Sequence, residues 1–298
     1  FQNEVLNFAS GDGTPKFNPF FIPKMIADIA PGNISIKNGF MGPNYTTVSA
    51  CASSANAMLD ALNYIRLGQC DVIVTGGSEA AVTIAGMGGF NSMHALSTRN
   101  ETAETASRPF DAERDGFVLG EGAGAIVLEE YEYAKARGAK IYAELCGFGM
   151  SGDAYHMTAP NMDGPRRCMN NALRDAGLNA DQIQYVNAHG TSTPLGDKNE
   201  TEAIKAALGD HAKKVVVNST KSMTGHLLGG AGGLESVFTV LALHHQKSPP
   251  TINIFNQDPE CDLDYCANAA RDLKISYAVK NNFGFGGTNG TLIFGNTP

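Results

Sequence analysis

Short apolar segments typical of strands alternate with helical patterns along the whole chain, and this alternation constrains the fold more than any other feature. Residues 71–77 are predicted to form a buried strand that ends in a glycine turn, and residues 122–129 a second strand. Residues 131–137 then predict a short helix closed by Gly138. Further strands are predicted at 141–145, 183–187, 215–219 and 291–294, and further helices at 166–176 and 234–244. The pattern predicts a layered α/β architecture.

Composition narrows the class of protein. The 298 residues are 43% hydrophobic and 17% charged, which is typical of a well-buried globular protein of one large domain or two fused smaller ones. A formal net charge of −8 argues against a general nucleic-acid binder. The six cysteines form no CxxC pair, no apolar run approaches the length of a membrane span, and no signal peptide is evident. We therefore expect a cytoplasmic protein that binds neither nucleic acid nor membrane.

Cys51 lies where a β-branched stretch, residues 46–48, runs into very small side chains. Apolar residues at helical spacing follow it at Met58, Leu59 and Leu62. The segment predicts a strand, a sharp turn and a helix, with the thiol at or near the helix N-terminus. The positive end of a helix dipole stabilises a thiolate, the form that attacks carbonyls. Free cysteine is also among the most buried residue types, so a packing role for Cys51 is an equal alternative at this point.

Two further segments place histidines after predicted strands. His189 is followed by glycine and by hydroxyl residues, including Thr191 and Thr193, which suit a polar, flexible ligand. Lys221 and His226 flank a turn of small residues, and a buried Lys221 would be costly unless paired or functional. The glycines after His226 are not followed by Gly-Lys-Ser/Thr, which disfavours a phosphate-binding loop. Taken alone, the segment of His189 favours a satisfied core histidine in a turn over a functional one.

A fourth segment, residues 282–290, surrounds aromatic side chains with glycines. Glycine permits unusual backbone angles, so a ring there can swing and a backbone N–H can serve as an oxyanion donor. An ordinary glycine turn before a terminal strand is the alternative. One cysteine and two histidines, each on a loop at the end of a strand, form a coherent set.

Six motifs together carry a specific resemblance; they are residues 48–51, 107–111, 114–124, 188–193, 219–226 and 282–289. At these residues the chain resembles the β-ketoacyl-acyl-carrier-protein synthases, the condensing enzymes of fatty-acid synthesis, and most closely the elongating enzymes of the synthase II type. Synthase I-like specificity stays open. The resemblance implies a thiolase-like fold of two similar α/β halves in five αβαβα layers, assembled as a homodimer. We expect the first half at residues 1–140, with the nucleophilic cysteine, and the second at 141–298, with the two histidines.

The resemblance also implies roles for single residues. Cys51 is expected to accept the acyl group, and His189 and His226 are the paired histidines. Lys221 falls on an active-site lysine of the family, and Phe285 on its gating phenylalanine. The expected substrate-binding residues are Thr191, Thr193, Thr158, Phe90 and Phe283. Backbone N–H groups of Cys51 and Phe285 would bind the oxyanion.

The implied activity is decarboxylative condensation of an acyl thioester with malonyl-acyl carrier protein, without a metal or a resident cofactor, since phosphopantetheine arrives on the carrier. The carrier is acidic, so Lys16, Lys24 and Arg99 are candidate docking residues. Family members begin with a strand-helix-strand portion ahead of Phe1, and its absence predicts an uncovered apolar face and leaves the activity of this chain alone open. Two alternatives remain: a non-catalytic fragment or partner subunit, and a cysteine hydrolase.

Overall fold

The computed structural model describes residues 2–297, and their internal contacts divide them into two compact units, 2–47 and 48–297. The first unit contains α1 (Gln2–Ala9), α2 (Phe21–Met25) and α3 (Ile29–Asn38). None of these helices buries a residue. The ring of Phe17 stacks on that of Phe21, with 5.0 Å between centroids. The small apolar contact area of this unit contrasts with the deep core of the second.

The second unit carries the remaining elements. Its helices are α4 (Ser53–Arg66), α5 (Ile84–Ser92), α6 (Tyr131–Ala136), α7 (Asp163–Ala176), α8 (Pro194–Leu208), α9 (Lys221–Thr224) and α10 (Ala231–His245), with short 3₁₀ turns at Ala103–Thr105, Ala180–Gln182, Gly209–Lys214 and Leu228–Gly230. Its strands are β1 (Val72–Glu79), β2 (Gly122–Glu129), β3 (Glu144–Gly152), β4 (Tyr185–Asn187), β5 (Val216–Asn218), β6 (Lys247–Ser248), β7 (Arg271–Asp272), β8 (Tyr277–Gly284) and β9 (Thr288–Gly295). Strands thus alternate with helices, as the sequence predicts.

The strands form one large and two small sheets. The large sheet has the order β3-β9-β8-β4-β5, in which β4 pairs in parallel with both β5 and β8, whereas β9 is antiparallel to β3 and β8. β1 and β2 form a separate antiparallel pair, and so do β6 and β7. The mixed sheet brings the ends of β4, β5 and β8 together, and the loops that follow these strands carry the candidate site residues.

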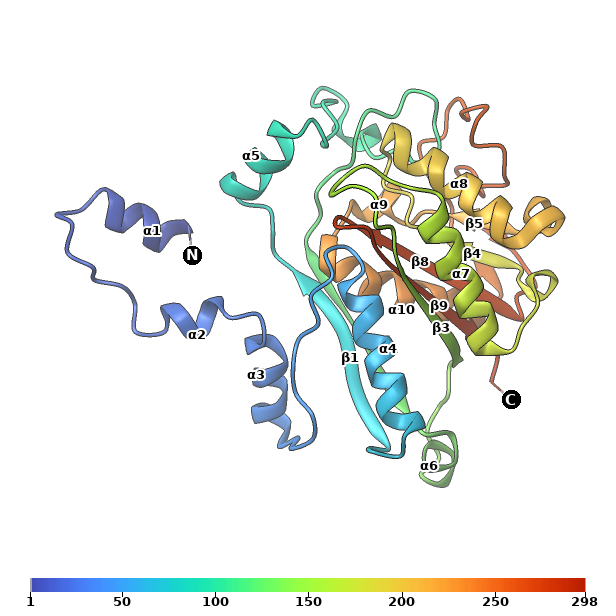
Figure 1. The fold of residues 1–298 in the computed structure, drawn as a ribbon, viewed down its shortest axis with the longest axis horizontal. Coiled ribbons are helices and arrows are strands. Elements are labelled where there is room, and N and C mark those ends of the chain that lie inside the picture. Colours follow the sequence, from blue (N-terminus) through green and yellow to red (C-terminus); the bar gives the residue numbers. More distant parts are fainter. Residues whose placement is uncertain (1, 298) are drawn as a thin grey trace. The chain divides into compact units, whose positions relative to one another are not determined.

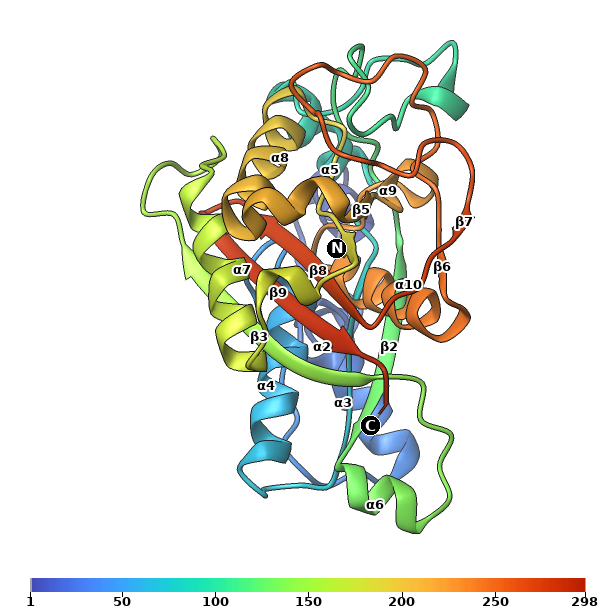
Figure 2. The same cartoon turned by 90° about the vertical axis from the view of Figure 1, so that its right-hand side faces the viewer.

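The helices cover the sheets in layers (Figures 1 and 2). α4 and α10 contact both the β1-β2 pair and the large sheet, and α7 and α8 lie on the other face of the large sheet. Helices lie on both faces because successive side chains of a strand point to opposite faces of the sheet, and both sets of side chains here are apolar. Tyr185 and Ala278 pack toward α10, whereas their neighbours Val186 and Val279 belong to the core beside α7 and α8. Both faces are apolar, so both are covered.

The structure confirms most predicted elements and corrects two of them. β2 has the predicted bounds, but residues 141–143 lie outside β3, because its partner β9 ends at Gly295 opposite Glu144. The β-branched residues 46–48 form no strand, since within residues 2–297 they find no neighbouring strand to pair with. The boundary between two halves near residue 140 stays a prediction, as the division into compact units falls at residue 47 instead.

Candidate active site

Cys51 sits in a sharp turn immediately before α4. Ala50 has φ +49°, a left-handed conformation that is costly for a residue with a side chain, and α4 begins two residues after the thiol, at Ser53. Ser53 fixes the turn, because its hydroxyl donates to the Ala50 carbonyl at 2.6 Å and accepts from the Ser49 N–H at 2.9 Å. The predicted turn and helix are therefore confirmed, although no strand precedes them.

The end of the β8-β9 hairpin packs directly against this turn. A Cβ on Gly284 would lie 2.9 Å from the backbone nitrogen of Cys51, so only glycine permits the approach. The hydroxyl of Thr288 donates to the Ser49 carbonyl at 2.8 Å. This contact brings the backbone of Phe285 to the sulfur, where a hydrogen bond from Phe285 opposes the rise in the pKa of Cys51. The Phe285 side chain itself is 40% exposed.

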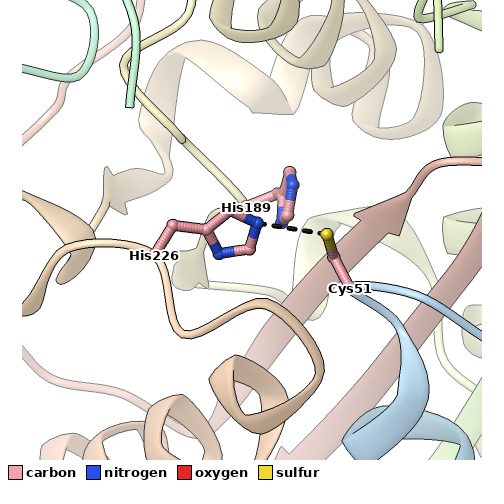
Figure 3. A group of neighbouring side chains, drawn as sticks. All are labelled: Cys51, His189 and His226. Atoms are coloured by element: carbon pink, nitrogen blue, oxygen red, sulfur yellow. Dashed lines mark hydrogen bonds between the residues drawn. The ribbon is translucent and has the colours of Figure 1, made fainter. Parts of the chain in front are cut away.

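His226 is the imidazole nearest to the thiol (Figure 3). Its Nε2 atom lies 3.1 Å from Sγ of Cys51. Its backbone N–H donates to the Val118 carbonyl at 2.7 Å, and its carbonyl accepts from the Gly120 N–H at 3.0 Å. The edge of the Phe117 ring meets the imidazole, with 5.4 Å between centroids. The loop that contains 114–124 therefore holds this histidine in place, a role that sequence analysis did not assign to it.

His189 follows β4 and stands almost perpendicular to His226, with their ring centroids 5.1 Å apart at an angle of 87°. Glu200, a buried residue of α8, fixes its backbone. One carboxylate oxygen accepts from the His189 N–H at 2.8 Å, and the other accepts from the Gly190 N–H at 2.7 Å. Gly190 is required here, since a Cβ would lie 2.6 Å from the Cβ of Ser219.

Burial governs the electrostatics of the three side chains. Burial raises the pKa of Cys51 to about 11, and the Lys221 charge and a Phe285 backbone hydrogen bond only partly oppose it. This environment favours the thiol over the thiolate at neutral pH, because desolvation penalises the charged form. Burial, followed by the positive charge of Lys221, lowers the pKa of both His189 and His226 well below 6.5, so both imidazoles are neutral.

Lys221 begins α9, just past β5, and is fully buried. Its Nζ lies 2.5 Å from a carboxylate oxygen of Glu235 on α10. The positive charge of Lys221 also lowers the pKa of Cys51. The other carboxylate oxygen of Glu235 lies 2.8 Å from Nζ of Lys280, which is also fully buried. Sequence analysis missed Glu200, Glu235 and Lys280. Glu235 and Lys280 could have been found as the single acidic or basic residue of an otherwise uncharged stretch, whereas Glu200 lies among other charged residues of α8 and gave no such signal.

A second buried network holds the loop after His189. Asp197 accepts hydrogen bonds from the Ser192 N–H at 3.1 Å and the Phe110 N–H at 2.9 Å, and it pairs with the Arg114 guanidinium at 3.4 Å. Through Phe110 and Arg114, the motifs at 107–111 and 114–124 therefore fix the carboxylate that binds the loop after His189. Within the loop, the Thr191 and Thr193 hydroxyls lie 3.0 Å apart and can hydrogen-bond each other, and their role in binding a ligand stays a prediction.

The remaining predicted substrate-binding residues differ in their contacts with the site. The ring centroid of Phe283 lies 5.8 Å from that of His189, and Phe90 meets Phe117, the ring that contacts His226, at 5.2 Å. Thr158 is exposed and hydrogen-bonds His156, and no contact with the three site residues is recorded for it.

The docking candidates are one arginine of the second compact unit and two lysines of the first. Arg99 donates to the Glu113 carbonyl at 2.8 Å and pairs with the carboxylates of Glu113 and Asp115, so its charge is partly committed. Lys16 and Lys24 are exposed in the first compact unit. All three remain predictions.

Cys51, His189 and His226 are also of residue types that bind zinc, and their potential ligand atoms all lie within 4.8 Å of one another. The positive charges of Lys221 and Lys280 lower the pKa of both imidazoles, and the same potential opposes the binding of a divalent cation. The set is therefore better suited to stabilising negative charge on a bound substrate than to holding a metal.

Among the helices of residues 2–297, none combines the length and the apolar character that a membrane span requires.

Comparison with known proteins agrees with this geometry. The beta-ketoacyl synthase N-terminal domain matches residues 2–134, and its C-terminal domain matches residues 142–255. The 3-oxoacyl-[acyl-carrier-protein] synthase 2 of Coxiella burnetii is 54% identical over 94% of this chain and 68% of its own length. The corresponding Synechocystis protein is 54% identical over 95% of this chain and 68% of its own length.

Solved structures give the same answer for the fold. A complex of a type II polyketide synthase acyl-carrier protein with its ketosynthase matches with a TM-score of 0.95 and 37% identity, over all of this chain and 75% of the matched one. A beta-ketoacyl synthase from Burkholderia phymatum matches with a TM-score of 0.92 and 40% identity, over 99% of this chain and 71% of that one. The predicted thiolase-like fold is confirmed by these neighbours, and the chain belongs to the β-ketoacyl synthase family.

Proposed function

We propose that this protein catalyses the decarboxylative condensation of an acyl thioester with malonyl-acyl carrier protein, the elongation step of fatty-acid synthesis. The observation that carries the proposal is the thiol of Cys51 at 3.1 Å from Nε2 of His226, with a second neutral imidazole beside it. The likeness to curated 3-oxoacyl-[acyl-carrier-protein] synthases of type 2 supports it. The protein is then an acyltransferase of the synthase II type.

The first half of the reaction is acyl transfer to Cys51. The sulfur attacks the carbonyl carbon of the acyl thioester, a carbon–sulfur bond forms to Cys51, and the bond to the phosphopantetheine sulfur breaks. The proton of the thiol passes to the departing thiolate, so the carrier leaves with a free thiol. The resting thiol protonation supports this order, because the pKa of about 11 keeps the proton on the sulfur until the thioester arrives.

Backbone N–H groups of Cys51 and Phe285 are the proposed donors to the tetrahedral oxyanion. The turn at Ala50 and the close approach of Gly284 bring these two stretches of backbone together. Preorganised donors of this kind stabilise the transition state, and loss of one typically costs about 10²–10³-fold in rate. The Phe285 ring, which is partly exposed, is the proposed gate between the two half-reactions.

The second half of the reaction takes place at the two histidines. When malonyl-carrier protein binds, the bond between its α-carbon and its carboxylate breaks and carbon dioxide leaves. His189 and His226, as neutral N–H donors, stabilise the thioester enolate that results. The α-carbon attacks the acyl group on Cys51, the acyl–sulfur bond breaks, and the Cys51 thiolate that leaves takes up a proton from solvent. The products are 3-oxoacyl-carrier protein and carbon dioxide.

The proposal includes the partners that such chemistry requires. The acyl groups arrive on an acidic acyl carrier protein through its phosphopantetheine, and the enzyme needs no resident metal or cofactor. A solved relative is itself a ketosynthase in complex with an acyl-carrier protein. Thr191, Thr193, Thr158, Phe90 and Phe283 are the proposed substrate-binding residues. Homodimer assembly and a cytoplasmic location complete the proposal and rest on the family resemblance.

Turnover by the full chain tests the proposal. Incubation with acyl- and malonyl-carrier protein should give 3-oxoacyl-carrier protein, and mass spectrometry should find the acyl group on Cys51. Cys51→Gln should abolish condensation and keep malonyl decarboxylation, whereas Cys70→Ser, at a partly buried thiol outside the site, should condense normally. Condensation by Cys51→Gln would reject the scheme.

The same experiment separates the two alternatives. A cysteine hydrolase would turn over ester or peptide substrates and would not transfer an acyl group to malonyl-carrier protein. A non-catalytic partner subunit would bind the carrier protein without acylation of Cys51.

A further inference from the structure

The candidate site contains two buried ammonium groups that contact the same carboxylate. Lys280 lies in the centre of the large sheet on β8, where its neighbours in register are Leu292 and Asn187. Its side chain is fully buried, as is that of Lys221. Both ammonium groups pair with the same carboxylate, that of Glu235, at 2.8 Å and 2.5 Å. Two positive charges thus lie against one carboxylate, and Glu200 is a second buried carboxylate that interacts with both of them.

Such an arrangement is costly if its only role is stability. A buried ammonium loses several kcal/mol of hydration, and an apolar side chain of similar volume at the same position is often neutral or stabilising. Lys280 has further contacts: its Nζ donates to the Asn281 carbonyl, and the Asn282 amide donates to the Glu235 oxygen that Lys280 also binds, at 3.2 Å. The carboxylate of Glu235 is therefore fixed through both oxygens, and with it the ammonium of Lys221.

The charge of Lys280 reaches the reacting groups. It lowers the pKa of both His189 and His226, in addition to burial and Lys221. The titratable groups that interact with Lys280 come from three helices: Glu235 on α10, Lys221 on α9 and Glu200 on α8. Burial and Lys221 lower the pKa of Lys280 to about 8, whereas Glu235 and Glu200 oppose that change. Lys280 thus couples the carboxylate that orients Lys221 to the potential at the imidazoles.

We propose that Lys280 is a second positioning lysine of the condensing reaction, which clamps the Glu235–Lys221 pair through the shared carboxylate and adds a buried positive charge that favours the enolate. This inference rests on the proposed function for its catalytic part. Its electrostatic part concerns the imidazoles alone and can be measured without turnover.

The experiment replaces Lys280 by Met, which keeps the length and removes the charge, in the Cys51→Gln background. Lys280→Arg keeps a charge, and Lys205→Met is the matched control at a partly exposed lysine on α8. We expect Lys280→Met to lower kcat for malonyl decarboxylation about tenfold at neutral pH with little change in KM. The acid limb of the pH–rate profile should move to higher pH, since the histidines become easier to protonate. The acid limb of Lys280→Arg should lie close to that of the wild type, and the acid limb of Lys205→Met should not move.

Imidazole titration by NMR gives the independent readout. Because the Lys280 charge lowers the pKa of both imidazoles, its removal should raise both values. Unchanged imidazole pKa values in a folded Lys280→Met protein would overturn the proposal, as would a fall in melting temperature with a wild-type pH–rate profile. If the wild-type chain decarboxylates nothing, the proposed function fails while the NMR titration still decides the role of Lys280. If Lys280→Met does not fold, Lys280→Gln replaces it in both measurements.

Discussion

The carboxylate of Glu200 accepts hydrogen bonds from the backbone N–H groups of His189 and of the residue after it, at 2.8 Å and 2.7 Å. One buried side chain on α8 therefore sets the direction in which a loop leaves the end of β4, and with it the position of the imidazole. The hydrogen bonds also stabilise the charged form of a carboxyl group whose burial raises its pKa. Position and ionisation of this part of the site are thus linked.

Replacement of Glu200 by Gln tests that link. The amide offers one acceptor oxygen where two N–H groups need partners, so one buried donor is left unsatisfied at a cost of about 1–3 kcal/mol in unfolding free energy. We expect kcat for condensation to fall about 10–100-fold as His189 shifts. Glu202→Gln, on the same helix with its side chain 46% exposed, is the control and should retain activity. Wild-type turnover by Glu200→Gln would show that the loop holds its shape without this contact.

Alkylation of Cys51 reports the protonation of the thiol. Because the pKa of Cys51 is raised to about 11, the thiolate fraction and the iodoacetamide rate should rise about tenfold for each pH unit between roughly pH 7 and 10. Lys221 lowers that pKa, so Lys221→Met should slow alkylation further at a fixed pH. Peptide mass spectrometry measures both rates. A rate that levels off near neutral pH would instead indicate a stabilised thiolate.

The buried imidazoles make stability depend on pH. The pKa of His226 is lowered well below the unfolded value of about 6.5, so the unfolded state binds more protons below that pH. The stabilisation that neutral His226 contributes to the unfolding free energy is therefore fully present above a pH of about 6.5. It is lost as the pH falls toward the pKa of His226 in the folded state, at up to about 1.4 kcal/mol per pH unit. His226→Asn should reduce this slope in urea titrations between pH 5 and 6.5 by about one proton.

The exposed His94 provides a matched control for that measurement. It has φ +54°, which asparagine tolerates well, so His94→Asn should fold and keep the wild-type slope. An equal loss of slope in both variants would mean that the pH dependence does not come from the active site.

The close packing of the β8-β9 hairpin on the Cys51 turn predicts the effect of one methyl group. In Gly284→Ala the new Cβ would lie 2.9 Å from the Cys51 nitrogen and 2.7 Å from the Thr288 hydroxyl, so the turn must move. We expect a loss of about 1–3 kcal/mol in stability and slower acylation of Cys51. Gly88→Ala, in helix α5 with open space around its Cα, should be neutral or stabilising in thermal melts.

Local patterns of the sequence were enough to predict several features of the fold and the site. The bounds of β2 followed from an apolar run between glycine and charge, and the turn before α4 from small residues ahead of helical spacing. His189, Lys221 and His226 were placed on loops after strands, and the structure brings the histidines to Cys51. The β-branched residues 46–48 gave a wrong prediction, because a strand needs a partner that local sequence does not supply.

Only the tertiary structure decided the electrostatics of the site. Glu235 is paired with Lys280, 45 residues further along the chain, and the resemblance did not point to either residue. From the sequence alone, the helix N-terminus favours a thiolate at Cys51, whereas burial by distant segments raises the pKa of the thiol in spite of the Lys221 charge. Sequence therefore determined which residues could react and on which loops they lie. Their protonation states depend on desolvation and on charges brought together by folding, and no local pattern records either.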